Sequence, residues 1–205
     1  MYKVVGDYHL KEKIGKGNFA DVYLGTHRST GLKYAIKAIS KELFVEPKLL
    51  AGLESEIKIM KDLIHPNIIQ LFKYFSSEKN FYLVVEYCAG GDLSKYIRKN
   101  HQLTEVVALN FLWQISEGIY FLHENRFIHR DLKPANVLLC ESADETITLK
   151  LADFGFARTL NIAALAQTRC GTPLYMVSLH ETVSVLFAID VCCFSGTRDL
   201  GGERI

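Results

Sequence analysis

The sequence lacks several features that would place it in a specialised class of protein. Its 205 residues contain five cysteines, an odd number, and no two of them form a CxxC pair. No histidine cluster stands at the spacing of metal ligands, so a zinc site or a disulfide-knot scaffold is excluded. We interpret the cysteines as small, partly buried thiols in a reducing compartment.

Long hydrophobic runs and an excess of either charge are also missing. The most apolar late stretch, residues 183–194, is shorter than the ~20 residues of a membrane-spanning helix and is interrupted by Asp190. The first seven residues lack the apolar segment of a signal peptide. Lysine and arginine total 24 against 23 for aspartate and glutamate. We therefore expect a cytoplasmic protein with no transmembrane segment and no nucleic-acid partner.

The first ninety residues show the pattern of a β-sheet with one helix. Residues 48–63 carry leucine, isoleucine and methionine at helical spacing, which predicts an amphipathic helix. His65-Pro66 ends it, because the residue before a proline avoids helical backbone. Alternating apolar and polar residues predict strands at 8–14, 21–27, 32–39, 68–75 and 81–86.

The periodicity changes after Gly90 and Gly91. Residues 92–99 and 104–124 are predicted to be helices, the second capped by Thr104. Short strands and loops are expected to follow, so the predicted fold class is α+β.

Three motifs carry chemistry, and the first is Gly15-x-Gly17-x-x-Ala20-x-Val22 between two predicted strands. Its glycines would let backbone N–H groups approach a phosphate closely, although a tight hairpin is an alternative. A dinucleotide-binding turn would need a helix directly afterwards, and residues 21–26 alternate as a strand instead.

The second motif places a lysine in an apolar strand, Ala35-Ile36-Lys37. A solvated surface lysine would explain it in isolation. Glu56 lies on the following predicted helix, near the face expected to pack on the sheet. An ion pair between Lys37 and Glu56 would hold the ammonium group ready for phosphate oxygens.

The third motif is the eight-residue stretch His129-Arg130-Asp131-Leu132-Lys133-Pro134-Ala135-Asn136. It sets a carboxylate, two cations and a carboxamide between apolar segments, where a core would not accept them without partners. Asp153-Phe154-Gly155 follows 22 residues beyond Asp131. A carboxylate at a strand end, followed by glycine, is a candidate Mg²⁺ ligand.

With these motifs in this order, the sequence resembles the eukaryotic protein kinases from about Tyr8 to Met176. The resemblance implies a bilobal protein-kinase-like fold. Its β-sheet lobe would be residues 1–87 and its incomplete helical lobe residues 88–176, with residues 177–205 forming a tail outside the family pattern.

The resemblance also implies roles for single residues, with ATP and Mg²⁺ as cofactors. Asp131 would accept the proton of the substrate hydroxyl, Lys133 would contact the γ-phosphate, and Lys37 the α- and β-phosphates. Asn136 and Asp153 would bind Mg²⁺. The remaining implied nucleotide-site residues are Ile14, Gly15, Lys16, Gly17, Val22, Ala35, Glu56, Val85, Glu86, Cys88, Asp92 and Leu138.

Within the family, Lys133 and residues 171–176 are similar to the Ser/Thr branch. Residues 153–158 resemble the autophagy-initiating, unc-51-like kinases. Arg130 beside the catalytic aspartate indicates control by phosphorylation, with Thr168 as the candidate site. An unmodified, solvent-facing Thr168 is the alternative.

After Met176 the sequence departs from the family, which continues with Ala-Pro-Glu and a long helical region. We expect the missing helices to leave Phe111, Trp113, Ile115 and Ile119 partly uncovered. The resemblance implies an ATP-dependent kinase that phosphorylates Ser/Thr hydroxyls of proteins in autophagy initiation, with a regulatory protein partner. The alternative is an inactive truncated fragment that binds a nucleotide or a partner.

Overall fold

The structure is a computed structural model of the whole chain, and it divides into two compact units, residues 1–89 and 90–205. The residues that the structure describes are 3–16, 20–44, 47–101, 103–129, 131–141, 146–153 and 158–159. Some side chains within these ranges, that of Glu56 among them, also lie outside the description.

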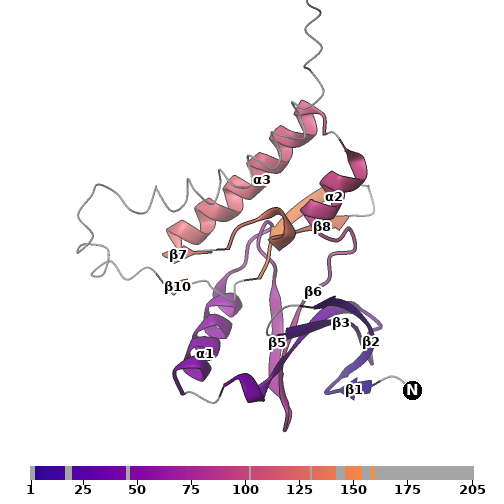
Figure 1. The fold of residues 1–205 in the computed structure, drawn as a ribbon, viewed down its shortest axis with the longest axis vertical. Coiled ribbons are helices and arrows are strands. Elements are labelled where there is room, and N and C mark those ends of the chain that lie inside the picture. The colour runs from indigo at the N-terminus through magenta and orange to yellow at the C-terminus, as the bar shows by residue number, and fades with distance from the viewer. Residues whose placement is uncertain are drawn as a thin grey trace, which may run out of the picture. The chain divides into compact units, whose positions relative to one another are not determined.

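The first unit is a six-stranded antiparallel sheet with one long helix, α1 (Pro47–Asp62), which packs beside β5 (Figure 1). The 3₁₀ helix η1 (Lys41–Leu43) precedes α1. In sheet order, the strands are β1 (Lys3–Val5), β2 (Tyr8–Lys16), β3 (Ala20–His27), β4 (Lys33–Ser40), β6 (Asn80–Glu86) and β5 (Leu71–Ser76).

The register of the strands decides which side chains share a face of this sheet. Lys37 on β4 lies opposite Val22 on β3, and Ala35 lies opposite Val85 on β6. Side chains alternate along a strand, so Lys37 and Ala35 point to one face and Ile36, between them, points to the other.

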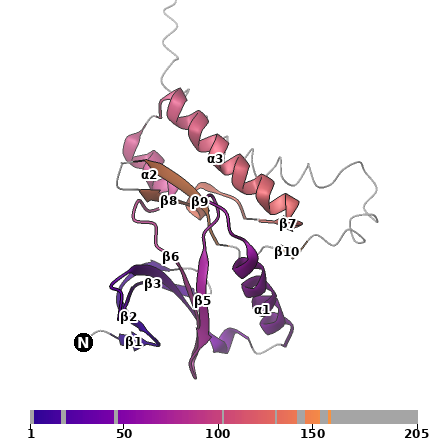
Figure 2. The ribbon, with the colours of Figure 1, turned by 180° about the vertical axis from the view of Figure 1, so that it is seen from behind.

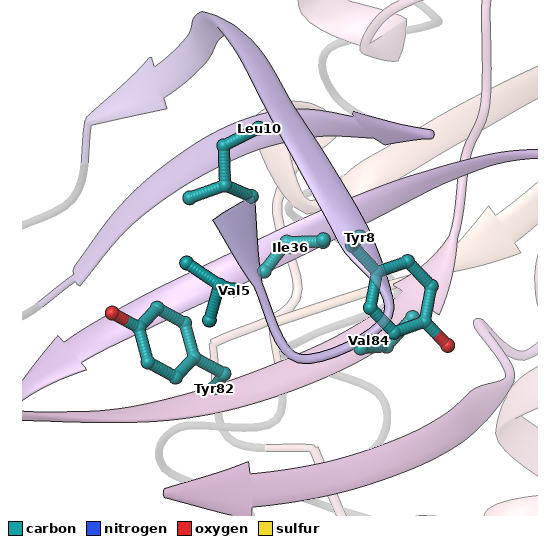
Figure 3. Packing of buried hydrophobic residues seen from close by; sticks show 6 residues of the cluster. All are labelled: Val5, Tyr8, Leu10, Ile36, Tyr82 and Val84. Carbon is teal, nitrogen blue, oxygen red and sulfur yellow. The ribbon is translucent and has the colours of Figure 1, made fainter. Parts of the chain in front are cut away.

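Ile36 belongs to a hydrophobic core on that second face (Figure 3). Gly25 on β3 faces it, and a Cβ atom there would lie 2.7 Å from Cγ1 of Ile36, so only glycine fits. This core braces the sheet on the face away from Lys37. Its six buried members are Val5, Tyr8, Leu10, Ile36, Tyr82 and Val84.

In its described residues, the second unit combines two α-helices with short strands (Figure 2). Helix α2 (Leu93–Asn100) is followed by α3 (Glu105–Glu124), and Oγ1 of Thr104 accepts a hydrogen bond from Val107 N at 3.4 Å. The later elements are β7 (Phe127–Ile128), the 3₁₀ helix η2 (Pro134–Asn136), β8 (Val137–Glu141), β9 (Ile147–Leu151) and β10 (Arg158–Thr159). Strand β8 pairs with β9, and β7 pairs with β10. Together, the sheet-rich first unit and this helical second unit confirm the predicted α+β class.

One expectation about α3 is wrong for three of its four residues. Phe111, Ile115 and Ile119 are at most 7% exposed, because β7 and β9 pack on that side of the helix. Trp113, in contrast, is 67% exposed, as expected. No helix in the described part of the chain is long and apolar enough to cross a membrane.

Gln114 joins α3 to the edge of β9. Its Nε2 donates to the carbonyl of Ile147 at 3.1 Å, and its Oε1 accepts from the N–H of Leu149 at 2.7 Å. The side-chain amide thus pairs with β9 much as a neighbouring strand would.

We expect Gln114→Ala to lower the free energy of unfolding by about 1–3 kcal/mol, because these two backbone groups of β9 lose their partner. Urea denaturation measures the change, and Ser116→Ala, on the exposed side of α3, is the matched control. Equal stability of the two variants would contradict a structural role for the amide.

Candidate functional site

The predicted nucleotide-site residues of the first unit gather on one face of the sheet. Gly15 on β2 pairs with Val22 on β3, and Val22 pairs in turn with Lys37 on β4. Ala35 on β4 pairs with Val85 on β6, and these two residues lie on the same face of the sheet as Lys37. Four strands therefore bring to one surface residues that lie far apart in the sequence.

Lys37 occupies a central strand and is half-buried. A surface lysine would be solvated along most of its length, whereas Lys37 is partly buried. Ile14 and Lys16, near the end of β2, are both exposed, and Glu86 ends β6. The predicted partner of Lys37 is untested, because the side chain of Glu56 lies outside the described residues.

Several other predictions also fall outside the described part of the chain. They concern Gly17 of the glycine-rich turn, Arg130, the candidate phosphorylation site Thr168, and the tail at 177–205.

In the second unit, the predicted ribose and adenine residues lie on adjacent segments. Asp92 pairs with Leu138, while Gly90 N donates to the carbonyl of Leu139 at 3.0 Å and Leu139 N donates to that of Gly91 at 2.9 Å. A Cβ atom at Gly90 would lie 2.9 Å from the Leu139 oxygen, so the close approach of this segment to β8 requires glycine.

The carboxylate of Asp92 also caps helix α2. Its Oδ1 accepts from the N–H of Lys95 at 2.9 Å, and its Oδ2 lies 2.9 Å from the ammonium of the same lysine. The first turn of α2 therefore orients the carboxylate of Asp92.

Asp131, Lys133 and Asn136 are brought together by the turn that leads into η2. The Lys133 ammonium lies 2.8 Å from Oδ2 of Asp131. Asn136 donates from Nδ2 to the same oxygen at 2.9 Å and to the Asp131 carbonyl at 2.8 Å. Because both bonds use the amide nitrogen of Asn136, its side-chain oxygen points away from Asp131.

His129 links this turn to the end of β9. Its ring is 2% exposed, and its Nδ1 accepts from the N–H of Asp131 at 3.4 Å. The Nε2 atom therefore carries the hydrogen and donates to the Ala152 carbonyl at 2.9 Å. Burial lowers the pKa of His129 below its usual value, so the ring stays neutral near pH 7. Sequence reasoning assigned no role to His129, although it opens the third motif.

Asp153 follows β9 with a backbone φ of +64°, in the left-handed region that few residues other than glycine adopt. The preceding Ala152 donates its N–H to the Asn136 carbonyl at 2.8 Å. This bond joins the backbone beside Asp153 to that of Asn136, the other candidate metal ligand. Strained backbone of this kind concentrates at functional sites, where the surrounding structure holds it in place.

The two candidate ligands have the chemistry that Mg²⁺ prefers. A carboxylate at Asp153 and an amide oxygen at Asn136 are hard donors, and Mg²⁺ commonly takes one or two such protein ligands and completes its shell with phosphate oxygens and water. Within the described ranges, no three His, Cys, Asp or Glu residues gather as a metal site. The oxygen donors of Asn136 and Asp153 by themselves fit a Mg²⁺ ion that is also bound by phosphate oxygens.

The cysteine interpretation requires a correction. Cys88 and Cys140, the two cysteines in the described ranges, are disulfide-bonded in the structure. The expectation of free thiols is wrong for both, because the spacing of cysteines along the sequence does not determine which of them are oxidised. The other three cysteines lie outside the described residues.

The family follows from the match between this chain and the protein kinase domain, which extends over residues 8–178. The chain therefore belongs to the protein kinase family. Among its relatives, the serine/threonine-protein kinase ATG1a of Arabidopsis thaliana is 47% identical over 174 residues, a span that covers 85% of this chain and 28% of the relative.

Two further relatives come from distant organisms. The serine/threonine-protein kinase atg1 of Dictyostelium discoideum is 43% identical over 85% of this chain and 27% of its own length. The ATG1 kinase of Komagataella pastoris is 36% identical over 84% of this chain and 26% of its own length. These relatives confirm the resemblance to Ser/Thr kinases of the unc-51-like branch, and the chain spans about a quarter of their length.

Proposed function

We propose that this chain is an ATP- and Mg²⁺-dependent protein serine/threonine kinase that acts in autophagy initiation. The observation that carries the proposal is the arrangement around Asp131, where Lys133 and Asn136 hold one carboxylate oxygen at 2.8 and 2.9 Å. A carboxylate held in this way suits a base that receives a proton from a hydroxyl group. Membership of the kinase family supports the same reaction.

In the proposed reaction, Lys37 and the glycine-rich turn bind the phosphates of ATP, and Ala35, Val85 and Leu138 contact its adenine. Bound Mg²⁺, held by Asn136 and Asp153, would neutralise charge on the phosphates.

The substrate hydroxyl oxygen attacks the γ-phosphorus while its proton passes to Asp131. The bond from that phosphorus to the bridging oxygen breaks, and ADP leaves. The Lys133 ammonium, beside Asp131, stabilises the negative charge of the transferred group.

The alternative function is a non-catalytic module that binds a nucleotide or a partner. Transfer of labelled γ-phosphate to a generic basic protein separates it from the kinase. We expect transfer by the wild-type chain and its loss in Asp153→Asn, with Asp62→Asn on the exposed end of α1 as the matched control. Transfer that Asp153→Asn leaves unchanged would reveal a contaminating kinase and contradict the proposal.

Thermal melts with and without ATP–Mg²⁺ give a second readout that does not need turnover. At 100 times its Kd, a bound nucleotide adds about 2.7 kcal/mol to the stability of the folded chain. We expect Lys37→Met to reduce this gain and the exposed Lys79→Met to leave it intact. A nucleotide-dependent gain without phosphate transfer would favour the non-catalytic module.

A cytoplasmic location belongs to the same proposal and rests on the kinase relatives. The disulfide-bonded state of Cys88 and Cys140 argues against a cytoplasmic location, because disulfides are rare in cytosolic proteins. Alkylation of cell extracts before and after reduction would count the free thiols. Disulfide bonds that persist at both positions in the extract would contradict a cytoplasmic location.

A further inference from the structure

Strand β2 does not pair with β3 in a regular ladder near the glycine-rich motif. Lys13 lies opposite Tyr23 and Gly15 lies opposite Val22, so β2 advances by two residues where β3 advances by one. A second shift of register separates Leu10 from Lys13. Each shift leaves an extra residue in β2, as in a β-bulge, and interrupts the hydrogen bonds between the two strands.

The bulge next to Gly15 changes the face of the sheet to which the end of β2 belongs. Through its pairing with β3 and β4, Gly15 shares the face of Lys37, where the predicted nucleotide site lies. By the same pairing, Lys13 shares the face of Ile36, which holds the hydrophobic core. Residues two positions apart on a regular strand share a face, so the extra residue Ile14 is what turns Gly15 toward the nucleotide face.

An ion pair spans this bulge on the face of the core. Nζ of Lys13 lies 2.5 Å from Oδ1 of Asp21 on β3, and the hydroxyl of Tyr23 donates to Oδ2 of Asp21 at 3.4 Å. The hydrogen bond from Lys13 lowers the pKa of Asp21, so the carboxylate is ionised near pH 7. Asp21 itself lies opposite Lys16, the last residue of β2. The pair therefore joins a residue before the bulge to the strand that faces the residues after it.

The location of this ion pair gives it more effect than its exposure suggests. The side chains of Lys13 and Asp21 are 37% and 38% exposed, so their attraction adds little to the stability of the whole unit. At the bulge, however, fewer backbone hydrogen bonds hold β2 to β3. Among the described residues of these two strands, no other ion pair joins them. Side-chain bonds therefore contribute a larger share of what holds the end of β2 in place.

We infer that Asp21 is a positioning residue for ATP that acts through Lys13. The ion pair holds the end of β2, with Gly15 and Lys16, against β3 and so fixes these residues relative to Lys37. Asp21 lies on the opposite face of the sheet from Lys37, so it acts by position and not by contact with the nucleotide. The inference rests on the ATP binding proposed above. Loss of the pair should weaken ATP binding and leave kcat at saturating ATP nearly unchanged.

The experiment breaks the pair from either side in the full chain. Asp21→Asn and Lys13→Gln both remove it, but they change the net charge in opposite directions. We expect each variant to raise the Kd for ATP–Mg²⁺ about three- to fivefold and to keep kcat within about twofold of the wild type. If the two charges instead acted on the nucleotide only through their field, Asp21→Asn would tighten binding and Lys13→Gln would weaken it. Calorimetric titration measures Kd without turnover, and phosphate transfer measures kcat.

Two further variants separate the pair from its individual residues. Lys13→Glu combined with Asp21→Lys exchanges the charges, and we expect it to return the Kd to within about twofold of the wild type. Asp7→Asn is the matched control, because Asp7, between β1 and β2, forms another exposed ion pair with Lys73 at 2.7 Å. This control should leave the Kd unchanged. Thermal melts without nucleotide verify that every variant folds.

Several results would overturn the inference. They are a Kd that neither single variant changes, shifts of opposite sign in the two, and a charge exchange that folds like the wild type without restoring binding. An equal rise in Kd for Asp7→Asn would point to a general loss of stability and contradict the positioning role. A wild-type chain that binds no ATP would overturn the proposed function together with this inference, whereas ATP binding that both single variants leave intact would contradict the positioning role alone.

Discussion

Replacing Asp131 with alanine is expected to lower kcat for phosphate transfer by about a thousandfold, the range over which a positioned acid or base acts. The substitution removes the oxygen that Lys133 and Asn136 hold at 2.8 and 2.9 Å. No other carboxylate lies on this turn to receive the hydroxyl proton. Lys37 and the sheet face around it are untouched, so the Kd for ATP should change little.

Steady-state transfer of labelled phosphate measures kcat, and the thermal shift with ATP–Mg²⁺ measures binding in the same samples. Asp62→Ala is the matched control, since Asp62 is exposed at the end of α1. Loss of transfer together with loss of the ATP shift would indicate a folding defect. Retention of transfer within tenfold of the wild type would show that Asp131 is not the base.

Replacing His129 with alanine is expected to lower the free energy of unfolding by about 2–4 kcal/mol, the combined effect of a cavity and of lost buried hydrogen bonds. The ring is 2% exposed and joins the N–H of Asp131 to the Ala152 carbonyl. Without it, the buried carbonyl loses its donor and the segments carrying Asp131 and Asp153 lose their link.

Urea denaturation measures this loss, and His129→Gln is the informative second variant, because its amide can donate to the Ala152 carbonyl. The expected order of stability is wild type, then glutamine, then alanine. His101→Ala, at an exposed histidine, should have a small effect. Equal stability of His129→Ala and wild type would contradict the linking role.

His129 also predicts a dependence of stability on pH. Burial lowers its pKa in the folded state below the 6.5 of the unfolded state, so the unfolded chain binds more protons as pH falls through 6.5. Its contribution is complete above pH 6.5 and declines as pH falls toward the folded pKa. The pKa of His123 is lowered by burial as well, with the same sign. The difference between wild type and His129→Gln across pH 5 to 7.5 isolates His129, and an identical slope would contradict the prediction.

Much of the fold could be predicted from local periodicity. Helix α3 begins one residue after its predicted cap Thr104, because a capping residue followed by an apolar row is a signal contained in the segment itself. Strand β1 was missed, since three residues carry too little alternation. Strand β5 begins at Leu71 rather than at residue 68, because Ile68 and Ile69 are buried in the connection after α1 and their apolar character resembles that of a strand.

The candidate site could be predicted as a set of residues but not as a set of contacts. Motif spacing indicated Asp131, Asn136 and Asp153 one by one. It could not indicate that Asn136 donates to Asp131, or that His129 bonds the residue before Asp153, because those bonds join positions 5 and 23 residues apart through folded loops.

The sequence by itself determined which residue types stand on which element, because the periods of helices and strands and the spacing of motifs are local properties. The tertiary structure alone decided which apolar side of α3 is covered. That helix is apolar on two opposite sides, so its sequence pattern is compatible with the burial of either side. The strands β7 and β9 pack against α3, whose Phe111 and Ile115 are buried, and Trp113 is left facing water.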